Sequence, residues 1–136
     1  MKYILMMSTP HDGYAQYLRW PKELLQANVA FMQRFARKLR DAGELVGTEG
    51  LASPQEAKKV RAGKDGRPIT DGVFPESKEF LAGYWIVDVE SPERAYEIAA
   101  EASGAPGQPV VSASGERVEH LWIEVRALIG SHKDVR

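Results

Sequence analysis

The sequence predicts an α+β fold of the ferredoxin-like type, a βαββαβ sandwich with a hairpin insertion. Its 136 residues are enough for one domain with one core. Extended apolar runs at residues 2–8, 44–51 and 81–90 alternate with two segments of helical periodicity. The element order is therefore strand, helix, strand, hairpin, strand, helix, strand, in which both helices pack on one face of a sheet.

The first half of this order begins with KYILMMS at residues 2–8, an apolar run that ends at a group of turn-forming residues. Residues 21–42 then carry apolar side chains at spacings of three and four, which predicts an amphipathic helix. Pro21 suits the first turn of this helix, and Gly43 suits its left-handed end. Residues 44–51 predict a second strand that two glycines weaken.

The second half begins with the hairpin, in which residues 57–61 and 67–70 flank a Gly-rich turn. Residues 81–90 contain Tyr, Trp, Ile and two Val, which favour a buried central strand. Ser91 and Pro92 then suit the start of the second helix, whose apolar stripe is Ala95, Ile98, Ala99 and Ala102. This helix can dock closely on a sheet because most of that stripe is small.

The last segment begins with a loop of unusual length, residues 104–115. Residues 119–128 follow it as a strand with alternating polarity, in which one side is Leu121, Ile123 and Val125 and the other is His120, Trp122, Glu124 and Arg126. The second set is too aromatic for a solvated face and too charged for a dry core. We therefore expect a partner subunit or a ligand to cover the sheet face opposite the helices.

Composition excludes several classes of function. Eighteen basic and nineteen acidic residues give a net charge of −1, which argues against nucleic acid or a membrane as the partner. Without cysteine there is no disulfide, thiolate nucleophile or Cys-ligated zinc, and with three histidines no metal site is expected. No signal peptide is predicted, so the expectation is a cytoplasmic protein with one domain at residues 1–128 and a polar tail at 129–136.

Three residues are candidates for acid–base chemistry. Asp71 could place a carboxylate at the mouth of a pocket for proton abstraction, or it could accept local backbone N–H groups in a turn. His11, beside Asp12, has the chemistry for proton transfer near neutral pH but also fits an exposed loop. His120 is predicted to lie on the uncovered face, where it could instead be an interface histidine.

Four further residues are candidates for substrate binding. Glu124 and Arg126 would leave the same face of one strand and could bracket an anionic substrate, or they could form a structural ion pair. Trp122 is expected beside them. Trp85 is the fourth candidate; it and Tyr84 point to opposite faces, so that only one of the two can line a cleft, and the sequence leaves open which one does.

The segment TDGVFPESKEFLAGY at residues 70–84 resembles the signature of YCII-related proteins of the DGPF type. The resemblance extends to the apolar N-terminal strand, to AGEL at residues 42–45, to Asp65-Gly66, and to WIVDVESPERAYEIA at residues 85–99. It also includes IEVR at residues 123–126, so it covers most of the chain.

This resemblance implies a ferredoxin-like protomer that forms a homodimer through its sheet faces, as a dimeric α/β barrel. Some relatives in the wider group are lyases that act on small molecules without a cofactor, and a His–Asp pair is proposed as the active site in others. The implied function is therefore a small-molecule cleft with cofactor-free chemistry of lyase or isomerase type, in which Asp71 is the base, His120 or His11 the acid, and Arg126 an anion clamp. The alternative implied function is a non-enzymatic module that acts with a sigma factor in transcription control.

Overall fold

The main sheet has four strands, and a computed structural model describes them within residues 1–10, 12–72, 79–112 and 114–130. The strands are β1 (Lys2–Pro10), β2 (Leu45–Gly50), β5 (Glu79–Asp88) and β8 (Ile123–Ala127). They pair antiparallel in the order β2–β5–β1–β8. Because β1 lies between two strands that come later in the sequence, the connections cross the sheet. The predicted ferredoxin-like α+β fold is confirmed.

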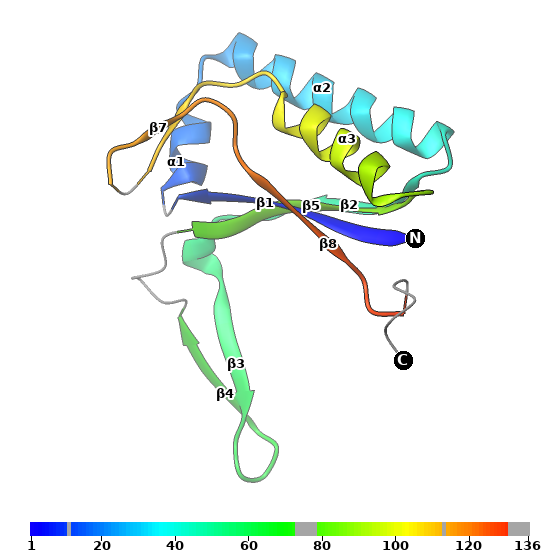
Figure 1. Cartoon of the computed structure of the whole chain (residues 1–136). Coiled ribbons are helices and arrows are strands. Elements are labelled where there is room, and N and C mark those ends of the chain that lie inside the picture. Colours follow the sequence, from blue (N-terminus) through cyan, green and yellow to red (C-terminus); the bar gives the residue numbers. More distant parts are fainter. Residues whose placement is uncertain (11, 73–78, 113, 131–136) are drawn as a thin grey trace.

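Within the described residues, three α-helices accompany the sheet: α1 (Gly13–Leu18), α2 (Lys22–Asp41) and α3 (Pro92–Ser103). Figure 1 shows α2 and α3 side by side over the same face of the sheet. The local signals for α3 are confirmed, since the Ser91 hydroxyl accepts a hydrogen bond from the Arg94 N–H at 3.2 Å and Pro92 is in the first turn. Gly43 ends α2 with a φ of 73°, which glycine adopts without strain. The short α1 helix was not predicted.

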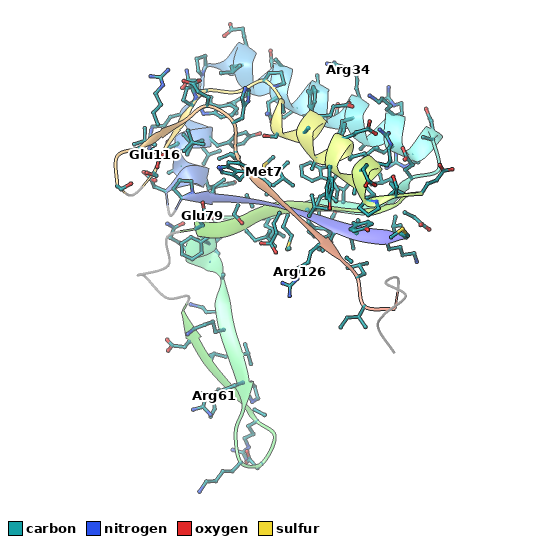
Figure 2. The ribbon with its side chains drawn as sticks, viewed as in Figure 1. Met7, Arg34, Arg61, Glu79, Glu116 and Arg126 are labelled. Atoms are coloured by element: carbon teal, nitrogen blue, oxygen red, sulfur yellow. The ribbon has the colours of Figure 1, made fainter. Side chains whose placement is uncertain are left out.

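The core lies between the helices and the sheet. Leu5, Val87, Leu39 and Ile98 are almost completely buried, and they come from two strands and two helices. The predicted apolar stripe of α3 is buried as a whole, and its small side chains let the helix approach the sheet closely. In Figure 2, Met7 lies between the sheet and the helices, whereas Arg126 points away on the opposite side.

The sheet face opposite the helices carries a central apolar patch, which we call the open face. It is formed by Ile4, Met6, Tyr84 and Ile86, which alternate along β1 and β5 with the buried residues of the core. Ile4 is the register partner of Ile86, and Met6 is the register partner of Tyr84. These four side chains therefore form one continuous surface on the two central strands.

A hairpin of two strands, β3 (Lys58–Ala62) and β4 (Pro68–Gly72), extends from the same side of the sheet as the open face (Figure 1). We call residues 58–72 the arm. The predicted hairpin is confirmed, with each strand shifted by about one residue. Gly66 has a φ of 82° in the turn, where a side chain would be strained. The 3₁₀ helix Pro54–Glu56 precedes the arm.

The segment between α3 and β8 differs from the prediction. It contains a small ladder of β6 (Val110–Val111) and β7 (Arg117–Val118), which was predicted as loop. The final strand begins at Ile123 rather than at residue 119, because residues just before it bond to the end of α3 instead of β1. The Ser103 hydroxyl donates to the Leu121 carbonyl at 2.7 Å. His120 and Trp122 therefore lie before the strand and do not share its alternation.

An ion pair connects the end of α2 with the start of α3. The guanidinium of Arg94 donates through Nε and one terminal nitrogen to the two carboxylate oxygens of Glu44, both at 2.8 Å. Glu44 lies just after α2 and Arg94 lies in the first turn of α3. The hydrogen bonds from Arg94 lower the pKa of Glu44 below its ordinary value of 4.5 and raise the pKa of Arg94.

We expect Glu44→Gln to lower the free energy of unfolding by about 1 kcal/mol at pH 7, because a half-buried, two-bond ion pair is lost. A carboxylate with a lowered folded pKa contributes its full stability above its unfolded pKa, so the difference should shrink as pH falls below 4.5 and disappear once pH has fallen through the lowered pKa of the folded chain. Urea unfolding of the wild-type chain and the variant at pH 7 and pH 3.5 measures this difference in the free energy of unfolding. Glu97→Gln is the control, since Glu97 contacts the same arginine from an exposed position at 3.4 Å. An equal loss in both variants would contradict this account.

No helix in the described part of the chain is both long and apolar enough to span a membrane.

Candidate functional site

The main cavity lies between the helices and one end of the sheet, with a volume of about 560 Å³. The ends of β1, β5 and β2 form its floor, and α1 and α2 form one wall. Met7, Met32, Ala36 and Trp85 are among the apolar side chains that line it. This volume is within the range of pockets that hold small organic ligands.

The chain after α3 closes the cavity on the opposite side. Gln16 on α1 holds this chain through both of its amide atoms: Nε2 donates to the Val111 carbonyl and Oε1 accepts from the Val111 N–H, each at 3.0 Å. Asn28 on α2 donates to the Pro106 carbonyl at 2.7 Å. Gly107 lies against Trp20, since a Cβ there would be 2.5 Å from the indole. The predicted long loop is thus fixed to both α1 and α2.

Aromatic side chains line the wall that α1 provides. Tyr14, Tyr17 and Trp20 all contribute, and the rings of Tyr17 and Trp20 meet edge to face at 5.0 Å. Their spacing of three residues between Gly13 and Pro21 is the sequence signal that could have identified α1. Sequence reasoning missed this wall because it assigned the segment to a turn.

The polar groups of the cavity carry little positive charge. Among the described residues that line it there is no lysine or arginine, whereas Glu49 and Glu119 contribute carboxylates at the rim. The carboxylate of Glu119 also pairs with Arg117 at 3.2 Å. Thr48 uses its hydroxyl hydrogen within the fold, as it donates to the Tyr84 carbonyl at 2.8 Å. The arrangement favours an uncharged or weakly basic molecule over an anion.

His120 lies at the rim of this cavity and is exposed. Its Nδ1 is 3.2 Å from the Ser103 carbonyl oxygen, which can only accept a hydrogen bond. Nδ1 therefore carries the proton in this contact, and Nε2 is the atom that can exchange a proton with a ligand. Of the three predicted catalytic residues, His120 is the one that the structure describes at the cavity.

Asp71 lies elsewhere, on β4 of the arm. It is exposed, and its Oδ1 accepts a hydrogen bond from the N–H of Gly72 at 2.8 Å, a local backbone contact of the kind that the turn interpretation anticipated. It does not line the cavity. One chain therefore does not bring Asp71 and His120 into one site. His11 and the signature residues 73–78 lie outside the described residues.

The four candidate binding residues also lie in different parts of the molecule. Trp85 lines the cavity and belongs to the core, where its ring meets Phe35 edge to face at 5.9 Å. Glu124 and Arg126 lie on β8, on the side away from the helices, with a carboxylate oxygen and a guanidinium nitrogen 3.9 Å apart. Trp122 is 90% exposed beside a groove between α3 and β8. An anion clamp at the main cavity therefore has no support from Arg126.

Metal binding has no obvious site in the described part of the chain, where no group of three or more His, Asp or Glu side chains is placed to hold an ion.

The family model of the YCII-related domain matches residues 1–119, which include the whole cavity wall from α1 and α2, the arm and α3. The match ends before β8. No curated protein matches the chain.

Proposed function

Because the chain belongs to the YCII-related family, we propose that it is a homodimer in which each protomer binds a small, mostly apolar molecule in the cavity between its helices and its sheet. The observation that carries this proposal is the cavity itself, which has apolar and aromatic walls and a few polar groups. Pockets of this volume and composition are typical of small-molecule sites. The narrower DGPF type, suggested by residues 70–84, stays a prediction.

The charge of the rim supports an uncharged or weakly basic ligand. An anion would meet the carboxylate of Glu49, which no lysine or arginine among the described lining residues offsets; the carboxylate of Glu119 is paired with Arg117, which does not line the cavity. Tyr14 and Tyr17 instead offer aromatic contacts to a flat apolar group. The ligand class is therefore a small aromatic or aliphatic compound with one or two polar groups.

The open face supports the homodimer. When one face of an antiparallel sheet is exposed to solvent, its side chains are normally polar. The centre of this face is instead apolar, because it carries Ile4, Met6, Tyr84 and Ile86. Glu124 and Arg126 lie beside it on β8, where each could pair with the opposite charge of a second copy. Two-fold association would bury this patch against itself.

Among the candidate residues that the structure describes in one chain, His120 is the one at the cavity that could take part in acid–base chemistry of lyase or isomerase type. Its Nε2 can exchange a proton at the rim, but Asp71 is on the arm and Arg126 is on β8. Binding is therefore the function that this geometry supports best, and catalysis would require groups from a second copy of the chain or from residues beyond the described ones.

Two fluorescent probes with the same ring system test the ligand class. N-phenyl-1-naphthylamine is uncharged, and 8-anilino-1-naphthalenesulfonate adds a sulfonate to the same rings. We expect the uncharged probe to bind at least about tenfold more tightly, a difference of about 1.4 kcal/mol, because the rim repels the anion. Fluorescence titration at several salt concentrations measures both. Equal affinities, or tighter binding of the sulfonate, would contradict the proposed ligand class.

A further inference from the structure

The arm has two chemically different faces. Strand partners share a face, and the register places Val60 opposite Thr70 and Ala62 opposite Pro68 on one of them, with the Lys58–Gly72 pair at the end of this face away from the turn. The other face pairs Lys59 with Asp71 and Arg61 with Ile69. The arm is thus an amphipathic hairpin with an apolar face centred on Val60.

The arm has little cover from its own chain. Every residue of β3 and β4 except Lys59 is exposed, and Val60 is 61% exposed. A hairpin of two strands is marginally stable in water when it stands alone. An exposed apolar face on such a hairpin indicates a surface that becomes buried on association.

The distribution of charge along the chain indicates what covers the apolar face of the arm. The arm has five basic and two acidic residues, a net charge of +3, so the rest of the chain has 13 basic and 17 acidic residues, a net charge of −4. A basic arm and a body of net negative charge attract one another, and a second copy of the chain supplies such a body. Figure 2 shows Arg61 far from the sheet and Glu79 at the end of the sheet from which the arm extends.

We propose that the arm of each protomer docks on the acidic body of a second copy through its Val60 face, beside the open faces that meet in the dimer. This inference rests on the homodimer proposed above. The segment that connects the sheet to the arm also lines the cavity, through Leu51, Ala52 and Pro54. Docking of the arm therefore fixes the cavity wall from which the arm extends, and dimerisation and ligand binding strengthen one another.

The test compares Val60→Asp with Ile69→Asp by sedimentation equilibrium. Both substitutions put an aspartate in place of a β-branched residue on the arm, but on opposite faces. We expect Val60→Asp to raise the dimer dissociation constant at least tenfold and Ile69→Asp to raise it less than threefold. We also expect the wild-type dimer to weaken as salt rises, since its arm contact is partly electrostatic.

Hydrogen exchange of the full-length wild-type chain gives an independent measure. Amide protection of residues 58–72 should rise with protein concentration in parallel with dimer formation. A dimer that Val60→Asp leaves unchanged, with an arm that stays unprotected, overturns the arm contact and leaves the open-face dimer intact. A chain that stays monomeric overturns both. Protection of the arm that appears only with duplex DNA or with vesicles of anionic lipid assigns the arm to that partner and overturns the proposal.

Discussion

Replacement of Ala36 by tryptophan is expected to raise the dissociation constant for N-phenyl-1-naphthylamine at least tenfold, by about 1.4 kcal/mol or more. Ala36 is a half-buried residue of α2 whose methyl group lines the cavity. An indole in that position occupies part of the 560 Å³ cavity and reduces the space left for the ligand. Fluorescence titration measures the effect.

Ala27→Trp is the matched control for this experiment. Ala27 is on the same helix, but it is exposed and does not line the cavity. The same chemical change there should leave the affinity within about twofold, and circular dichroism checks that both variants keep the fold. If the two variants bound the probe equally well, the cavity would not be the binding site.

The second large effect is expected from Ile86→Lys on the open face. Ile86 is paired with Ile4 at the centre of the sheet, and a two-fold interface would contain the new charge twice. Burial of an unpaired ammonium is costly, so we expect the dimer dissociation constant to rise about 100-fold, or about 2.8 kcal/mol. Light scattering after size-exclusion chromatography at several protein concentrations measures it.

Leu18→Lys provides the comparison. Leu18 is 58% exposed at the end of α1, away from the open face, and its substitution adds the same charge. This variant should associate like the wild-type chain. If Ile86→Lys stayed dimeric under conditions where the wild-type chain is dimeric, the open face would not be the interface.

The sequence predicted the parts of the fold that depend on neighbouring residues. Ser91 and Pro92 mark the start of α3 because capping and a missing N–H act within one turn. Gly43 marks the end of α2 for a similar local reason, since only the backbone conformation of that residue is involved. The ferredoxin-like class followed from the order of such elements along the chain.

The errors come from contacts between distant residues. His120 and Trp122 were predicted on the last strand by alternation, but Leu121 contacts Ser103, 18 positions earlier in the sequence, and the strand begins only at Ile123. Likewise Gln16 holds Val111 across 95 positions, so the long loop is fixed to α1 although nothing near it in the sequence indicates that. Side-chain alternation cannot report such contacts.

The candidate site was predicted less well than the fold. His120 and Trp85 were named and do line the cavity, whereas Asp71 and Arg126 do not. The cavity itself depends on how α1, α2 and the chain after α3 pack together, and no local pattern encodes that volume. Met32 and Ala36 were predicted as part of the apolar stripe of α2, but helical periodicity does not distinguish a residue that faces a cavity from one that faces a filled core.

The most direct test of the cavity as the ligand site uses the three tryptophans of the chain, whose indole N–H resonances can be followed by NMR during titration with N-phenyl-1-naphthylamine. Trp20 and Trp85 line the cavity, whereas Trp122 lies outside it and is 90% exposed. Our account predicts that the resonances of Trp20 and Trp85 shift as the probe binds and that the resonance of Trp122 stays in place. A shift of Trp122 alone would contradict it and would put the ligand in the groove between α3 and β8.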